Sequence, residues 1–147
     1  MIRPARAFDV EAVGRLLTEL GRSPLGDATR HRFRSGFLAH LRRRDTASLV
    51  AVEDGQVVGF CSLEFRPRLN RMRAQAWIPD LIVDRAARGR GHGRQLLERA
   101  FQLAGERGCW SVTLESGHHR QEAHRLYMSA GMEDAGVYFI RQLEADV

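Results

Sequence analysis

The sequence contains no lysine, and all 23 of its basic residues are arginine. The absence of lysine excludes enzymes built on a Schiff-base lysine, including pyridoxal enzymes, and the phosphate-binding P-loop that needs one. Against 18 acidic residues, the arginines leave a net charge of +5. This surplus favours an anionic partner such as a nucleotide cofactor, an acidic substrate or nucleic acid, although a biased genomic base composition would produce it equally well.

Cysteines and long apolar runs are also scarce. The two cysteines, Cys61 and Cys109, lie in apolar stretches and form no CxxC pair. We expect two buried free thiols in a reducing compartment, and neither a zinc site nor a cysteine nucleophile. No run approaches the roughly 20 apolar residues that span a bilayer, and no signal peptide is recognisable. The sequence therefore predicts a cytoplasmic protein without a membrane partner.

The order of predicted elements indicates an α/β domain with a mixed sheet. At 147 residues the chain fits one domain, residues 1–147, that needs no disulfide or metal to fold. A loop is expected at 21–26, and Asp54-Gly55 predicts a tight hairpin turn. Apolar periodicity predicts helices at 10–20, 29–43, 91–107 and 120–130, and strands at 2–5, 48–53, 56–65, 74–83, 111–115 and 137–143.

Proline interrupts one of these strands. Pro79 stands inside 74–83, and a proline cannot donate a hydrogen bond to a neighbouring strand. We therefore expect a bulge or an unpaired stretch at Pro79. Asp80, directly after it, begins the apolar run of Leu81, Ile82 and Val83.

A turn rich in glycine and arginine follows that run and opens a helix. Glycines let the backbone approach a ligand, and the free N–H groups and dipole of a helix N-terminus favour an anion. Interleaved arginines add charge and paired donors. We expect this turn to bind a phosphate or pyrophosphate; it comprises Arg88, Gly89, Arg90, Gly91, His92, Gly93 and Arg94.

Two alternative interpretations of this turn are a dinucleotide-binding fingerprint and a plain left-handed turn. A dinucleotide-binding fingerprint needs G-x-G-x-x-G early in the chain, whereas this sequence has G-x-G-x-G late in it. A plain glycine-rich left-handed turn is the simpler alternative, but it does not explain why arginines alternate with the glycines.

A second motif lies about 35 residues downstream. On a helix, Ala123, Leu126, Tyr127 and Ala130 share one face, and Gly131 ends the helix. Taken alone, a tyrosine in this setting is more often part of the core than a catalyst.

Together the two motifs resemble the GCN5-related N-acetyltransferase (GNAT) family, and more weakly the aminoalkylphosphonate N-acetyltransferases. The family signature [Arg/Gln]-x-x-Gly-x-[Gly/Ala] matches Arg88, Gly91 and Gly93, and the pattern A-x-x-[LF]-Y-x-x-x-G-[FM] matches residues 123–132. The resemblance implies a three-layer αβα fold with a mixed, mostly antiparallel sheet of six to seven strands and about four helices. It also implies transfer of an acetyl group from acetyl-CoA, as co-substrate, to an amine in a ternary complex.

Roles for individual residues follow from the resemblance. The backbone of Leu81, Ile82 and Val83 would bind the pantetheine arm, the turn 88–94 would bind the pyrophosphate, and Tyr127 would be the general acid at the sulfur. Many family members carry an asparagine where this chain has Arg120. Because that asparagine contacts the pantetheine arm in the family, Arg120 and its neighbour His119 are candidate cofactor contacts.

The general base is left open by the sequence. Asp80 is the first candidate because it stands beside the expected bulge, and a solvated aspartate at a strand end is the alternative. His119 and Glu115 are further candidates. No metal site is expected, since adjacent histidines such as His118 and His119 point to opposite sides of an extended segment.

The acceptor and partners are the least determined features. Arginines at 30–44 and 66–73 suit either an acidic small-molecule amine, such as an aminoalkylphosphonate, or a solvated basic face. Acetylation of protein amines, an acyl-CoA sensor without activity and a nucleic-acid-binding module are alternatives. The last is disfavoured because aromatics are 7% and no recognition motif is present. An exposed edge of the strand expected at 137–143 would allow a homodimer.

Overall fold

The computed structural model describes residues 1–21 and 26–144 and forms two compact units, Met1–Leu114 and Glu115–Val147. Residues 22–25 of the predicted loop lie outside the described part of the chain. The first unit contains the strands β1 (Ile2–Pro4), β2 (Thr46–Glu53), β3 (Gln56–Arg68), β4 (Arg73–Trp77), β5 (Leu81–Val83) and β6 (Val112–Thr113), the helices α1 (Val10–Glu19), α2 (Asp27–Arg42) and α3 (His92–Glu106), and the 3-10 turns η1 (Ala7–Asp9) and η2 (Arg85–Ala87).

The six strands form one sheet that is antiparallel except at one edge. Its order is β1-β2-β3-β4-β6, and β5 pairs with β3 beyond the end of β4. Only the β4–β6 pair is parallel among the described strands. Each predicted helix is found with ends within two residues of those expected, and the predicted mixed, mostly antiparallel sheet is confirmed.

A tight hairpin joins β2 to β3, as the Asp54-Gly55 pair predicted. Both turn residues have positive φ, 51° at Asp54 and 76° at Gly55, and Glu53 pairs directly with Gln56. Two left-handed residues match the natural twist of paired strands, so this sequence fixes the register of the long β2–β3 ladder.

Strand β3 pairs along one side with both β4 and β5, and a bulge separates the two. In the β4 ladder Glu64 lies opposite Trp77, so the numbers of the two residues in each pair sum to 141. In the β5 ladder Phe60 lies opposite Ile82, and the numbers of the two residues in each pair sum to 142. One extra residue therefore stands between the ladders, which confirms the interruption predicted at Pro79.

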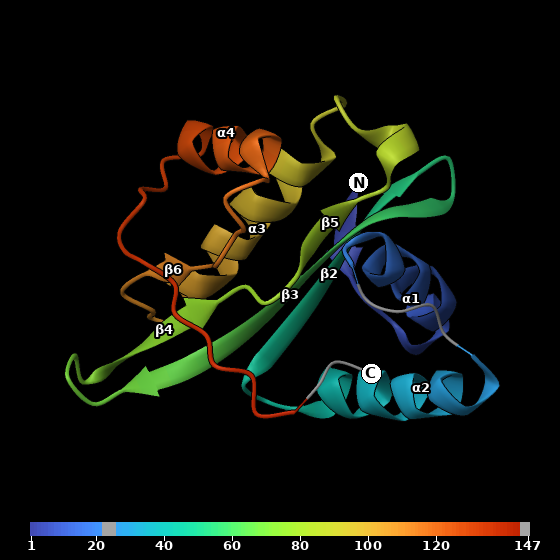
Figure 1. Ribbon diagram of the computed structural model, residues 1–147, viewed down its shortest axis with the longest axis horizontal. Coiled ribbons are helices and arrows are strands. Elements are labelled where there is room, and N and C mark those ends of the chain that lie inside the picture. The colour runs from blue at the N-terminus through green and yellow to red at the C-terminus, as the bar shows by residue number, and fades with distance from the viewer. Residues whose placement is uncertain (22–25, 145–147) are drawn as a thin grey trace. The chain divides into compact units, whose positions relative to one another are not determined.

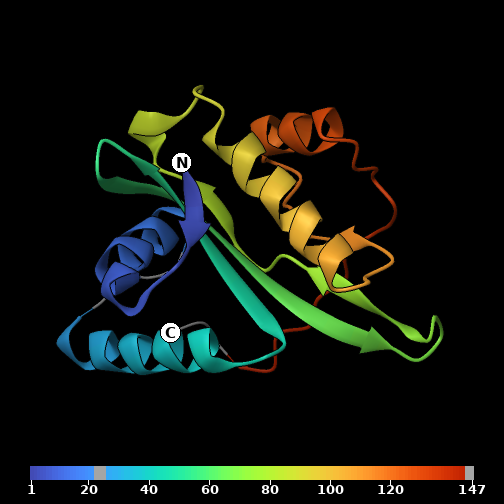
Figure 2. The same ribbon diagram turned by 180° about the vertical axis from the view of Figure 1, so that it is seen from behind.

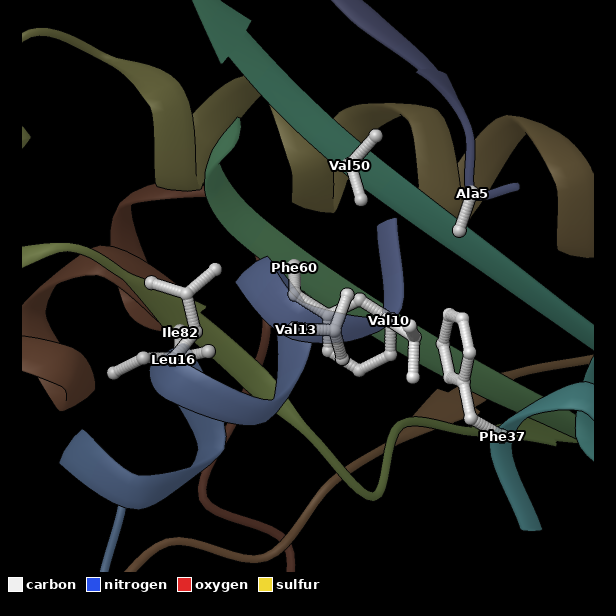
Figure 3. Close-up of a cluster of buried hydrophobic side chains, with 8 residues drawn as sticks. All are labelled: Ala5, Val10, Val13, Leu16, Phe37, Val50, Phe60 and Ile82. Atoms are coloured by element: carbon white, nitrogen blue, oxygen red, sulfur yellow. The ribbon is translucent and has the colours of Figure 1, made fainter. Parts of the chain in front are cut away.

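Helices cover the two faces of this sheet. Helices α1 and α2 lie on one face and α3 on the other (Figures 1 and 2). On the α1–α2 face, the row Val50, Phe60 and Ile82 crosses three strands and meets helix residues (Figure 3). Side chains alternate along a strand. The even-numbered residues of β3 near Phe60 therefore face α1 and α2.

The opposite face of β3 packs against α3. Leu96, Leu97 and Ala100 of that helix are fully buried, as is Leu63 of β3. At Gly59 an added Cβ would lie 3.0 Å from a methyl carbon of Leu96 and 3.3 Å from the Ile82 carbonyl oxygen. The missing side chain lets α3, which begins at the glycine–arginine turn, approach β3 and β5 closely.

The second unit contains one helix, α4 (Gln121–Ser129). Gly131 has φ +90°, and Met132 N–H donates to the Tyr127 carbonyl at 3.0 Å, so the predicted helix end at Gly131 is confirmed. The strand predicted at 137–143 is wrong, because these residues form no ladder and are exposed. β-forming residues make a strand only where a partner strand is available. The homodimer expected from that strand's edge stays a prediction without this support.

A buried ion pair connects β1 to the start of α1, and we expect its loss to destabilise the first unit. Arg3 donates two hydrogen bonds to Asp9, at 2.8 and 2.9 Å, and Arg6 N–H donates a third at 2.7 Å. Burial alone raises the pKa of Asp9, but these hydrogen bonds and the two arginine charges outweigh it and hold the pKa below its usual range. The pair therefore stabilises the fold above the pKa of unfolded aspartate and is lost as the pH falls through the lower folded value.

Asp9→Ala should cost about 2–3 kcal/mol in the free energy of unfolding at pH 7. Urea denaturation at pH 7 and at pH 3 measures this cost, which should shrink at the lower pH. Asp45→Ala is the control, because its bidentate pair with Arg43 is exposed. An equal effect of both variants would contradict the assignment.

Candidate active site

Strand β5 presents part of its backbone away from the sheet. Ser62 N–H donates to the Asp80 carbonyl at 2.9 Å, and Asp84 N–H donates to the Val58 carbonyl at 2.7 Å. Hydrogen-bonded and non-bonded residues alternate in an antiparallel ladder, so the N–H and C=O groups of Leu81 and Val83 point away from β3. Across the described residues β5 pairs with no other strand. These are the backbone groups to which an extended ligand could add hydrogen bonds.

The glycine–arginine turn joins this strand to α3. Gly89 and Gly91 both have left-handed backbone, with φ +80° and +85°, and Gly91 is the residue that caps α3. A Cβ added at either glycine would meet no atom within 4 Å, so the space beside the turn is open. The unpaired N–H groups of the first helical turn open onto this space, which is the geometry of an anion site.

Each arginine of the turn has a partner nearby. Arg88 Nε donates to the Val83 carbonyl at 3.0 Å, which connects the turn to β5. Arg90 forms an ion pair of 2.7 Å with Glu53 at the end of β2. Arg94 contacts Glu98 one helical turn later at 3.3 Å. Carboxylates therefore offset part of the positive charge that the arginines bring to this turn.

His92 was predicted to belong to the same turn, and its side chain lies in the interior. The residue is 8% exposed, and within the described chain neither ring nitrogen has a hydrogen-bond partner. The Glu53 carboxylate lies 3.6 Å from Nε2. The ring thus packs under the turn, and only the backbone of His92 is in a position to serve an anion outside it.

Asp80 lies directly after the bulge on the α1–α2 side. Ser62 Oγ donates to Asp80 Oδ2 at 2.9 Å, and in the described part of the chain Oδ1 accepts no hydrogen bond. Burial raises the pKa of Asp80, and the negative charge of Glu64 raises it further. The hydrogen bond from Ser62 and the charge of His40 lower this pKa, but burial outweighs them. The result is a carboxyl with a raised pKa and one free oxygen, which suits proton transfer.

Three side chains that the sequence did not single out influence the pKa of Asp80. Ser62 and Glu64 lie on the same face of β3 as Phe60, and His40 lies near the end of α2. The polar residues Ser62 and Glu64 interrupt the apolar positions of this face, and that break in alternation was the available signal. Nothing local marked His40.

The remaining candidates lie in the second unit. Tyr127 is half-buried on α4, and His119 and Arg120 precede the helix. The His119 ring folds over Gly117, where an added Cβ would lie 2.7 Å from it. Leu81–Val83, the turn and Asp80 are brought together in the first unit, whereas Tyr127, His119, Arg120 and Glu115 form part of the second.

Two further searches of the described residues bear on the function. No group of three or more histidine, cysteine, aspartate or glutamate side chains is placed to bind a metal ion. None of the described helices is long and apolar enough to cross a membrane. Cys61 is buried, and burial raises the pKa of its thiol well above the usual range.

Comparison with known proteins adds independent evidence. The profile of the acetyltransferase (GNAT) family matches residues 11–132. Aminoalkylphosphonate N-acetyltransferase of Salmonella typhimurium is 30% identical over 97% of this chain and 90% of its own. Glucosamine 6-phosphate N-acetyltransferase of Trypanosoma brucei brucei is 34% identical over 54% of this chain and 56% of its own. A solved structure from Agrobacterium tumefaciens str. C58, provisionally assigned as an acetyltransferase, is 29% identical, with a TM-score of 0.86 over 97% of this chain and 99% of that one.

Proposed function

The chain belongs to the GNAT family and is an acyl-CoA-dependent N-acetyltransferase; from this premise we propose that it acetylates a small primary amine that carries a phosphonate or phosphate group. The observation that carries the proposal is the arrangement in the first unit. A strand with free backbone groups, an open turn at a helix N-terminus and a carboxyl of raised pKa follow one another within residues 80–94.

The cofactor's place follows from that arrangement. Acetyl-CoA is the co-substrate of the family, and its pantetheine arm would extend β5 by hydrogen bonds to the outward backbone of Leu81 and Val83. Its pyrophosphate would occupy the space beside Gly89 and Gly91, where the N-terminus of α3 and the arginines stabilise negative charge. Glu53 would then compete with the pyrophosphate for Arg90.

The chemistry needs three groups. Asp80 would take a proton from the acceptor's ammonium, so that the amine can attack the thioester carbon. The outward N–H of Leu81 would stabilise the oxyanion that forms there. The resemblance to the family assigns to Tyr127 the donation of a proton to the departing sulfur, which leaves as the thiol of coenzyme A. One N–C bond forms and one C–S bond breaks, and the proton gained by Asp80 balances the one given by Tyr127.

The acceptor class rests on charge along one face of the sheet. Ser62 and Glu64 are followed on the same face of β3 by Arg66 and Arg68. Arg66 lies over the Trp77 ring at 4.4 Å, and Arg68 donates to Gln75 at 2.7 Å. An ammonium at Asp80 and an oxyanion towards these arginines would suit a small amine with an acidic group. Two relatives named for the acetylation of an aminoalkylphosphonate and of glucosamine 6-phosphate support this class.

The test is release of free thiol from acetyl-CoA in the presence of matched amines. We expect 2-aminoethylphosphonate or glucosamine 6-phosphate to be acetylated with kcat/KM at least about tenfold above ethanolamine or glucosamine, since a charged hydrogen bond contributes about 1.5–3 kcal/mol. A preference for the neutral amines, or for a lysine peptide, would reject the acidic acceptor. The absence of turnover with every amine would reject acetyl transfer to small molecules.

A further inference from the structure

One carboxylate oxygen lies between two side chains of the glycine–arginine turn. Glu53 is the last residue of β2, and its Oε2 is 2.7 Å from a terminal nitrogen of Arg90. The same oxygen is 3.6 Å from Nε2 of His92. It is therefore hydrogen-bonded to Arg90, and it lies roughly half an ångström beyond the usual hydrogen-bond range from His92.

The packing of α3 on the sheet brings these residues together. Val50 of β2 faces α1 and α2, and side chains alternate along a strand, so Ala51 and Glu53 face α3. On α3, His92 is four residues before the fully buried Leu96, and the two share the side of the helix that packs on the sheet. Glu53 and His92 thus meet under the start of α3, although they are far apart in sequence.

The ring of His92 lacks a hydrogen-bond partner in this arrangement. The residue is 8% exposed, and neither Nδ1 nor Nε2 forms a hydrogen bond with any described residue. A neutral imidazole has one N–H donor and one acceptor nitrogen, and burying them unpaired is costly. The carboxylate of Glu53 is an acceptor beside Nε2, but here it is engaged by Arg90.

We propose that Glu53 sets the affinity of the pyrophosphate site by exchanging Arg90 for His92. The inference rests on the proposed function, in which the pyrophosphate of acetyl-CoA lies beside Gly89 and Gly91. Arg90 turns from Glu53 to the pyrophosphate, which offers two negative charges and paired acceptor oxygens. The released carboxylate of Glu53 moves to His92 and accepts the N–H of its ring. No covalent bond changes and no proton is transferred in this exchange.

Two contributions of opposite sign follow from the exchange. Breaking the ion pair opposes binding, and because the side chains of Arg90 and Glu53 are 55% and 28% exposed, the pair is worth only about two- to fivefold in affinity. The new hydrogen bond satisfies the buried ring of His92 and returns part of this loss. Glu53 therefore weakens the hold on the cofactor, which favours release of the product coenzyme A.

Calorimetric titration of coenzyme A tests the exchange without turnover. Glu53→Gln keeps a carbonyl oxygen for His92 but loses the charge that holds Arg90, so its Kd should be about two- to fivefold lower than that of wild type. Damage to the fold cannot produce tighter binding. Asp54→Asn is the matched control, because it removes one negative charge from the next residue of the hairpin, and its Kd should equal that of wild type. A Kd for Glu53→Gln equal to or above that of Asp54→Asn would overturn the proposal.

Removing Arg90 separates the exchange from a general effect of charge. Arg90→Gln should bind coenzyme A more weakly than wild type, because the turn loses one cation. In that background Glu53→Gln should bring no further change, since the carboxylate has no arginine left to release. An equal gain in affinity with and without Arg90 would mean that Glu53 repels the cofactor through space, and the exchange would be rejected.

His92 provides the second readout, in a crystal structure of the complex with coenzyme A. Arg90 should contact the pyrophosphate, and a carboxylate oxygen of Glu53 should lie about 2.7–3.2 Å from His92 Nε2. An intact Glu53–Arg90 pair in the complex would overturn this inference and leave the cofactor site standing. If wild type binds no coenzyme A, the proposed function and this inference both fail. If coenzyme A binds as expected but no amine is acetylated, only the proposed function fails, because both readouts measure binding.

Discussion

Gly91→Glu should abolish binding of acetyl-CoA, with an affinity loss of more than about 100-fold. The residue caps α3 with φ +85°, and its missing side chain leaves the space beside the helix N-terminus open. A glutamate there would place a carboxylate where the pyrophosphate is expected and would reverse the favourable field of the turn. Calorimetric titration of acetyl-CoA into wild type and variant measures the loss.

Strain at a left-handed residue must be separated from the loss of the anion site. Gly108→Glu is the matched control, because Gly108 also has positive φ, +74°, with open space around its Cα, but it lies beyond the other end of α3. Both variants should lose similar stability, of about 1–2 kcal/mol. Only Gly91→Glu should lose the cofactor. Equal affinities in the two variants would mean that the pyrophosphate lies elsewhere.

Asp80→Asn should reduce kcat by about 10²–10⁴-fold, because an amide cannot take the acceptor's proton. Its carbonyl oxygen can still accept the Ser62 hydrogen bond, so the bulge and β5 should keep their geometry. Acetyl-CoA affinity should therefore stay within about twofold of wild type, since no charge of the turn is altered. Steady-state kinetics and calorimetry on the same sample separate the two effects.

The same variant should be as stable as wild type or more stable at neutral pH. Burial raises the folded-state pKa of Asp80, so the ionised side chain disfavours the folded state above that pKa, and this cost disappears as the pH falls through it. Asparagine removes the charge at every pH. Asp54→Asn, in the exposed β2–β3 hairpin turn, is the control that should change neither kcat nor Tm. A clear drop in Tm for Asp80→Asn would give the carboxylate a structural role instead.

The parts of the site that the sequence predicted are those built by near neighbours in the chain. Gly89 and Gly91 adopt positive φ, as a turn at a helix N-terminus requires, and Pro79 interrupts the strand because proline has no N–H to donate. Asp54-Gly55 likewise fixes the hairpin. Each of these features depends on the conformational limits of one or two residues, so it can be read without knowing what packs around them.

The strand expected at 137–143 shows the limit of such readings. Val137, Tyr138, Phe139 and Ile140 favour extended backbone, yet the segment is exposed and unpaired in the structure. Local preference for extended backbone cannot by itself supply the hydrogen bonds of a ladder, which come from another strand. Whether such a segment joins a sheet is a property of the tertiary structure.

The sequence by itself determined the family, the glycine–arginine turn and the bulge, because short motifs and backbone restrictions encode them, whereas the role of Asp80 as the base stays a prediction. Only the tertiary structure decided the surroundings of Asp80. His40, Ser62 and Asp80 come from a helix, a strand and a bulge, and no spacing in the sequence relates them. Ser62 and Asp80 are joined by a hydrogen bond across the bulge, and α2 packs Phe37 against Phe60 of β3 while the His40 carbonyl accepts from Thr46 of β2. The polar surroundings of the proposed base are thus set by how apolar surfaces pack.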